Sequence, residues 1–196
     1  MITSSLKFTS TVGLLFLAVS FASANSPLSC ITCEGIGCLR TSLTKKETCI
    51  DPLDICVTVF DGFQVVRKGC SLSVPIELRK KCNTPNGIEC HKCNQDNCNT
   101  WGRDDYRCVE CDSSRNADCK NNPSAIAPTR CASPTSPNSY CYARIESSKT
   151  TRGCSLSVKD QQECFKSANC MLCLAGDVKA CNAVNFTPGS ARAFLI

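Results

Sequence analysis

The clearest pattern of hydrophobic positions in this chain lies in residues 56–74. Two runs rich in β-branched and aromatic residues, 56–60 and 63–66, are separated by Asp61-Gly62. A two-residue Asp-Gly loop between such runs is typical of a β-hairpin. The sequence therefore predicts two antiparallel strands that turn at Asp61-Gly62.

The predicted loop also sets the register of this hairpin. It places Phe60 opposite Phe63. Cys56 then lies opposite Arg67, and because side chains alternate along a strand, Cys56 and Cys70 are expected to point to opposite faces. We expect each of these two cysteines to bond to another part of the chain rather than to the other.

The end of this hairpin is repeated in the second half of the chain. Gly69–Val74 recurs letter for letter as Gly153–Val158, and ten cysteines surround each copy in the same order. A second hairpin is predicted from 139–146 and 149–154, and Ser73 or Ser157 is expected to begin a short helix. Equal cysteine order with variable loop length indicates a duplicated cysteine-rich domain.

Composition places these domains in an oxidising compartment. Residues 12–21 are mostly apolar and precede Ala22-Ser23-Ala24, the pattern of a cleaved secretory signal peptide. All 20 cysteines follow it, which predicts a disulfide scaffold in an extracellular protein. The predicted organisation is a signal peptide (1–24), a first domain (25–99), a linker (100–107), a second domain (108–182) and a C-terminal tail (183–196). The tail has fewer apolar residues than a lipid-anchor signal needs, so we expect no membrane anchor there.

The cysteine pattern resembles that of the Ly6/uPAR three-finger superfamily. The shared features are an opening Cys-x2-Cys, a central hairpin that ends in Gly-Cys, clustered eighth and ninth cysteines, and a closing Cys-Asn at Cys98-Asn99 and Cys181-Asn182. The eighth and ninth cysteines are separated by two residues, where most members have them adjacent. This spacing is similar to that of an insect family of secreted proteins of unknown function with tandem ten-cysteine repeats. The resemblance implies a small, disulfide-rich, all-β fold with two tandem three-finger domains.

The resemblance also implies a disulfide pairing. For the first domain the implied bonds are Cys30–Cys56, Cys33–Cys38, Cys49–Cys70, Cys82–Cys90 and Cys93–Cys98. For the second domain they are Cys108–Cys141, Cys111–Cys119, Cys131–Cys154, Cys164–Cys170 and Cys173–Cys181.

Candidate chemistry other than binding is disfavoured. The four Cys-x2-Cys pairs have zinc-ligand spacing, but the signal peptide, the even cysteine count and the single histidine favour disulfides, so we expect no metal and no other cofactor. His91 lacks a recognisable nucleophile motif around it, and the carboxylates are scattered, so we expect no enzyme activity. The net charge of +5 is too mild to indicate nucleic-acid binding.

These observations predict a secreted binding protein with an extracellular protein partner. The aromatic residues at the hairpin tip, Phe60 and Phe63, are candidates for partner binding, or else a cross-strand pair that fixes the register. Alternative functions are a structural component of extracellular matrix or cell junctions, and an enzyme inhibitor. Asn185 lies in the one allowed glycosylation sequon, followed by Pro188.

Overall fold

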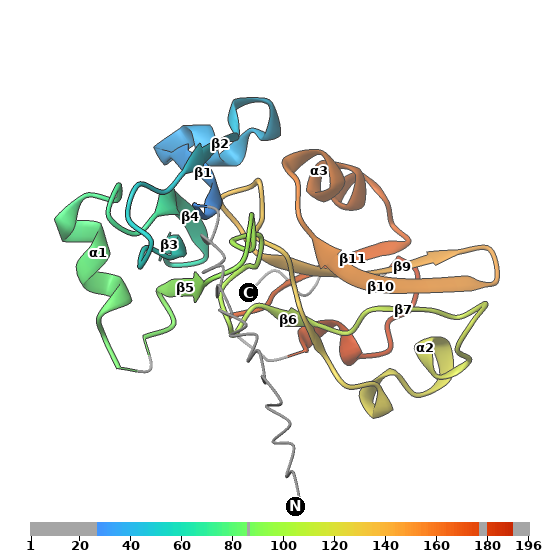
Figure 1. The fold of residues 1–196 in the computed structure, drawn as a ribbon. Helices are drawn as coiled ribbons and strands as arrows, with labels where there is room; N and C mark the ends of the chain where they lie inside the picture. The colour runs from blue at the N-terminus through green and yellow to red at the C-terminus, as the bar shows by residue number, and fades with distance from the viewer. Residues whose placement is uncertain (1–26, 86, 177–179, 190–196) are drawn as a thin grey trace, which may run out of the picture.

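A computed structural model describes residues 27–85, 87–176 and 180–189. The predicted signal peptide and the end of the predicted tail lie outside these residues. Two mostly β units lie side by side, the first blue to green and the second yellow to red (Figure 1). Among the described residues no helix has both the length and the apolar composition to span a membrane.

The first unit is built on a five-stranded antiparallel sheet in the order β2-β1-β4-β3-β5. The central β3–β4 hairpin was predicted from its hydrophobic pattern, and a short helix packs against it. The elements of this unit are β1 (Ser29–Glu34), η1 (Gly35–Leu39), η2 (Thr41–Leu43), β2 (Lys45–Thr48), β3 (Cys56–Asp61), β4 (Gln64–Cys70), α1 (Ile76–Cys82) and β5 (Cys90–Cys93).

The second unit repeats the central sheet with strands β7-β10-β9-β11 and adds a two-stranded ladder of β6 and β8. The predicted hairpin is confirmed, with its turn at Ser147-Ser148. The elements are β6 (Arg107–Cys108), β7 (Cys111–Asp112), α2 (Asp118–Asn121), η3 (Pro123–Ala125), β8 (Thr129–Arg130), β9 (Tyr140–Glu146), β10 (Lys149–Ser155), α3 (Val158–Lys166), β11 (Cys170–Leu174) and η4 (Cys181–Ala183).

One of the two expected helix caps is present. The Ser157 hydroxyl accepts a hydrogen bond from the Asp160 amide at 3.1 Å and donates to its carboxylate at 2.6 Å, which caps α3. Helix α1 begins after Pro75 without a side-chain cap. The expected alternative, Ser73, instead donates its hydroxyl hydrogen bond to Glu47.

All 20 cysteines form disulfides, and the ten pairs are those implied by the family resemblance. Three cysteines lie side by side across the central strands of each unit, and each bonds to a cysteine outside its own row. The rows are Cys70-Cys56-Cys93 in the first unit and Cys154-Cys141-Cys173 in the second. These bonds form much of each core, as expected for domains too small to rely on apolar burial alone.

The predicted register of the first hairpin is wrong. The two-residue loop is Gly62-Phe63, and a bulge between Val59 and Phe60 shifts the pairing further. Val65 rather than Phe63 lies opposite Phe60, and Cys56 lies directly opposite Cys70 on the same face. The two sulfurs nevertheless have different partners, Cys30 and Cys49.

The closing Cys-Asn of each unit has a structural role. The buried carboxamide of Asn99 donates to the carbonyl oxygens of Ile31 and Val57 at 2.8 and 3.0 Å and accepts from the Ile31 amide at 3.0 Å. Asn182 makes the equivalent bonds in the second unit, with Val109 and Tyr142. Asn99 thereby joins the first strand of its unit to the central hairpin, and Asn182 joins the segment just after β6 to the central hairpin of the second unit.

Candidate functional site: an apolar groove in the first unit

The loop between β2 and β3 exposes aliphatic side chains to an unusual degree. Ile50 is 99% exposed and Leu53 is 90% exposed. Leu72, in the turn after β4, is more than half exposed beside the same groove. The groove has a volume of about 410 Å³ and is lined by Glu47, Thr48, Cys49, Ile50, Asp51, Asp54, Cys70, Leu72 and Ser73.

The loop that carries these side chains is fixed at both ends. The Cys49–Cys70 disulfide joins its start to the end of β4. Within the loop, the Asp51 carboxylate accepts a hydrogen bond from the Leu53 amide at 2.7 Å. At its end, the buried Asp54 carboxylate accepts from the Leu72 amide at 3.2 Å and from the Ser71 hydroxyl. The exposure of Ile50 and Leu53 is therefore a property of an anchored loop.

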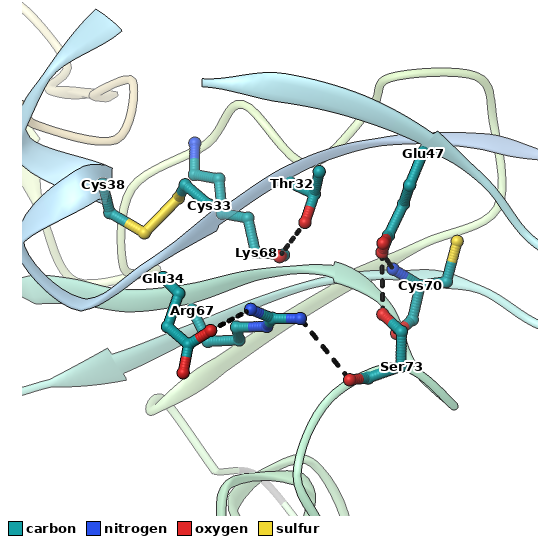
Figure 2. Close-up of polar contacts among 9 residues, drawn as sticks. All are labelled: Thr32, Cys33, Glu34, Cys38, Glu47, Arg67, Lys68, Cys70 and Ser73. Carbon is teal, nitrogen blue, oxygen red and sulfur yellow. Dashed lines mark hydrogen bonds and ion pairs between the residues drawn. A yellow bond between two sulfur atoms is a disulfide. The ribbon is translucent and has the colours of Figure 1, made fainter. Parts of the chain in front are cut away.

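Glu47 fixes the other wall of the groove. Its Oε1 atom accepts from the Cys70 amide and from the Ser73 hydroxyl, the latter at 2.7 Å (Figure 2). A Cβ atom at Gly69 would collide with this carboxylate oxygen. The glycine of the repeated Gly-Cys-Ser-Leu-Ser-Val sequence is thus favoured in the first unit by its φ of +158° and by the close approach of the Glu47 carboxylate.

Arg67 ties the turn after β4 to the end of β1. Its guanidinium donates to the Glu34 carboxylate at 2.8 Å and to the Ser73 carbonyl oxygen at 3.5 Å (Figure 2). The groove lining itself contains three carboxylates, Glu47, Asp51 and Asp54, and no basic side chain. Aliphatic side chains next to acidic ones make this face complementary to a partner that presents apolar and basic groups.

The predicted exposed aromatic tip is not found at Phe60. Phe60 is fully buried and packs with Val65 and the Cys33–Cys38 disulfide. The bulge leaves Val66 of β4 unpaired and places Val65 opposite Phe60, a pairing that a two-residue loop at Asp61-Gly62 did not anticipate.

Phe63 is half-buried and contacts the second unit of the same chain. Its ring lies edge-on to Tyr106, with ring centroids 6.3 Å apart, and the Arg103 guanidinium lies 3.9 Å from its centroid. Gly176 approaches the same ring so closely that a Cβ atom there would collide with it. The Phe63 ring thus lies at the contact between the two units, where Tyr106, Arg103 and Gly176 occupy its surroundings.

Polar groups complete the contact between the units. Lys68 is buried and donates to the Ser133 hydroxyl at 2.5 Å, and burial lowers the pKa of its ammonium to about 8. His91 is half-buried, and burial together with the nearby cations Arg130 and Lys68 lowers its pKa to about 4, while Asp104 acts in the opposite direction. A histidine that remains neutral at physiological pH fits this predominantly cationic surrounding.

The predicted linker belongs structurally to the second unit. Trp101 forms a β-bridge with Ala132, and the Gly102 amide donates to the Cys131 carbonyl oxygen at 3.0 Å. The Trp101 side chain is 46% exposed, so it covers one edge of that unit only partly. Asn185 is exposed and accepts a hydrogen bond from Arg152 at 3.4 Å, and its glycosylation stays a prediction.

The cysteine clusters have no free thiolate for a metal. Among the described residues, groups of three close potential ligands occur at Cys30, Cys49 and Cys70 and at Cys108, Cys131 and Cys154. All six sulfurs are in disulfides, whereas zinc binds the thiolate. The sulfurs gather because two disulfides of each unit lie next to each other, with Cys30 Sγ 3.3 Å from Cys49 Sγ and Cys108 Sγ 3.3 Å from Cys131 Sγ.

The residues that line the groove are not among those predicted from the sequence to bind a partner. The available signal was Ile50-Asp51-Pro52-Leu53-Asp54, where two aliphatic residues occur in a short polar, proline-containing segment between Cys49 and Cys56. Such a segment suits a surface loop, and aliphatic residues in it have no strand or helix face through which to be buried.

Comparison with protein families gives one result for each unit. A family model described as "Domain of unknown function (DUF753)" matches residues 28–99 and again residues 106–182. Both matches begin just before the first strand of a unit and end at the closing Asn99 or Asn182. No curated protein matches the chain.

Proposed function

We propose that this chain, which belongs to the DUF753 family and carries two tandem copies of its cysteine-rich domain, is a secreted, non-enzymatic protein-binding module that uses the groove beside Ile50 and Leu53. The partner is an extracellular protein that inserts an apolar side chain and places basic groups near the carboxylates of the groove. The units are assigned to the three-finger class of the Ly6/uPAR superfamily. Support for that assignment comes from the disulfide pairing and the repeated central hairpin.

The observation that carries this proposal is the exposure of Ile50 and Leu53 on an anchored loop. An aliphatic side chain that is almost wholly exposed gains about 1.5–3 kcal/mol when it is buried against a partner. The Cys49–Cys70 disulfide and the carboxylate of Asp54 already hold the loop in place. Binding therefore costs little ordering of the loop, which is the condition under which exposed apolar groups contribute most to affinity.

Secretion is supported by the ten disulfides, which persist in an oxidising compartment. A non-enzymatic role is supported by the surroundings of the single histidine. The pKa of His91 is lowered to about 4 at the contact between the units, so the imidazole is a poor general base at neutral pH.

The test is groove-dependent capture of a partner from extracellular fluid. The intact oxidised chain is compared with the double variant Ile50→Ser/Leu53→Ser, and with a matched control, Ile76→Ser/Val158→Ser, which removes two other exposed aliphatic side chains. We expect a partner bound by the wild type and the control, with affinity reduced at least about tenfold in the groove variant.

Equal capture by all three proteins would overturn the groove as the binding site. Incorporation of the chain into insoluble matrix without a saturable partner would favour the structural alternative instead. Because both variants change only exposed side chains, circular dichroism and a thiol assay should show an unchanged, fully oxidised fold.

A further inference from the structure

The second unit contains a cavity between helix α3 and the sheet. Figure 1 shows α3 lying over β9, β10 and β11. The cavity has a volume of about 280 Å³ and is lined by Tyr142, Arg144, Cys154, Ser155, Asp160, Glu163 and Cys164. It lies in a different unit from the groove and is independent of the proposed protein binding.

The first unit has an apolar core at the equivalent place. Alignment on the repeated cysteines places Val57 and Val59 at the positions of Tyr142 and Arg144, and Leu78 at the position of Asp160. In the first unit these residues pack between sheet and helix with Val74 and Cys82. The second unit keeps a smaller apolar cluster of Leu172, Tyr140 and Tyr142 with two cysteines, and it has polar side chains, Arg144 and Asp160, where the first unit has Val59 and Leu78. Burying polar groups without partners costs stability, and such costs are typically found at functional sites.

Two buried polar atoms in the lining have no hydrogen-bond partner within the described part of the chain. Ser155 is 2% exposed, and its hydroxyl is unpartnered. Ser155 lies opposite Tyr140 in the β9–β10 pair and so shares the face that α3 covers. The Nε atom of Arg144 is likewise buried and unpartnered. Buried polar atoms nearly always have a hydrogen-bond partner. The unpartnered Ser155 hydroxyl and Arg144 N–H line the same cavity, and together they indicate a site for a polar ligand.

Carboxylates lie at the mouth of the cavity. Asp160 and Glu163 are one helical turn apart on α3 and are both exposed, whereas Ser155 and Cys164 are buried at its base. Asp160 accepts from the Ser157 hydroxyl, Glu163 lies 3.9 Å from Lys159, and Arg144 lies 3.6 Å from Glu146. The lining carries two acids against one guanidinium, so its net charge favours a cation.

We propose that this cavity binds a small hydroxylated primary amine. The ammonium lies between the carboxylates of Asp160 and Glu163, and the hydroxyl oxygen accepts from Arg144 Nε while bonding to the Ser155 hydroxyl. The ring of Tyr142 offers an aromatic face to the carbon skeleton. Gly153 makes room for this ring, because a Cβ atom there would lie 3.0 Å from Tyr142 Cε1.

The test is calorimetric titration of the full oxidised chain with tyramine, which carries a primary amine and a hydroxyl on an aromatic ring. Phenethylamine lacks the hydroxyl, and 3-(4-hydroxyphenyl)propionate replaces the ammonium with a carboxylate. We expect tyramine to bind, phenethylamine to bind about five- to tenfold more weakly, and the carboxylate to show no binding. Absence of tyramine binding at up to about 10 mM, a concentration that detects even a weak complex, overturns the proposal.

Variants separate a ligand site from a structural one. Ser155→Ala is expected to weaken tyramine about five- to tenfold without lowering the melting temperature, because its hydroxyl has no partner to lose. Glu163→Gln is expected to weaken tyramine at least about tenfold, whereas Glu77→Gln, a matched change on helix α1, leaves it unchanged. Equal affinity in wild type, Ser155→Ala and Glu163→Gln would show that tyramine binds elsewhere and would overturn the site.

Discussion

Phe63 of the first unit lies edge-on to Tyr106 at the start of the second, with their ring centroids 6.3 Å apart. Tyr106 is itself fully buried and donates its hydroxyl hydrogen bond to the Tyr140 carbonyl oxygen at 2.9 Å. The tip of the central hairpin is therefore attached to the core of the neighbouring unit. This contact sets how the groove of one unit and the cavity of the other are presented together.

Phe63→Ala is expected to weaken the contact between the units. The change removes the aromatic contact with Tyr106 and the cation–π contact with Arg103, for a loss of about 1–3 kcal/mol. Guanidinium unfolding of the oxidised protein, together with small-angle scattering, measures the loss of stability and any separation of the units.

Gly176→Ala tests the same contact from the opposite side. Its new Cβ would collide with the Phe63 ring, so the single variant is also destabilised. In the double variant Phe63→Ala/Gly176→Ala the collision is gone, and the two effects should be clearly non-additive. Simple additivity would show that the ring and Gly176 do not meet in solution.

Asn99→Asp is expected to destabilise the first unit by about 2–4 kcal/mol, because the carboxyl cannot donate to both Ile31 and Val57. The melting temperature should fall by at least about 8 °C. Asn182→Asp should have the same effect on the second unit, and the exposed Asn94→Asp serves as the control. Equal melting temperatures for all three variants would contradict a bridging role of the two buried carboxamides.

Stability is expected to decrease as the pH falls from 6.5 towards 4. The pKa of His91 is about 4 in the folded protein and near 6.5 in the unfolded chain, so in this window the unfolded state binds more protons. A fully buried group would contribute about 3 kcal/mol, and for a half-buried imidazole we expect about 1–2 kcal/mol.

The variant His91→Gln isolates this effect, because every other titrating group is unchanged. The wild type and the variant should differ in the pH dependence of their unfolding free energy only below about pH 6.5, where a histidine begins to take up its proton. The charges that face His91, namely Arg130, Lys68 and Asp104, remain in both proteins. Parallel stability curves from pH 4 to 7 would contradict the burial of a neutral imidazole.

Gly69→Ala is expected to deform the groove. The new Cβ must displace the Glu47 carboxylate and break its bonds to the Cys70 amide and the Ser73 hydroxyl, a loss of about 2–3 kcal/mol. Gly37→Ala, which meets no atom within 4 Å, is the control. In a Glu47→Ala background the Gly69→Ala change should cost less, and the remaining loss reflects the strain of a non-glycine residue at a φ of +158°. A full additional loss in that background would show that the contact with Glu47 does not contribute.

The sequence predicted the architecture of this protein better than its surfaces. Cysteine order and the repeated Gly69–Val74 segment were sufficient to predict the tandem units, because the same disulfides can form when the loops between the cysteines differ in length. The predicted register of the first hairpin was wrong. Neither the one-residue bulge opposite Phe60 nor the Gly62-Phe63 loop has a sequence signal that outweighs the turn signal of Asp61-Gly62.

The surfaces were not predictable, because they depend on long-range placement. Nothing local to Phe63 shows that Tyr106 will cover it, and nothing local to Ile50 shows that it will remain uncovered. From the sequence, the only signal of the cavity is a difference between the two units. Tyr142 and Asp160 differ from Val57 and Leu78 at aligned positions, but only the packing of α3 on the sheet shows that these positions face one another.

The position of the bridging asparagines has a consequence for the order of folding during synthesis. Asn99 is the last residue of its unit, yet its carboxamide joins the first strand to the central hairpin. The first unit can complete these bonds only after its entire length, up to Asn99, is available for folding. The second unit completes its own closure later, when Asn182 is available to bond to Val109 and Tyr142.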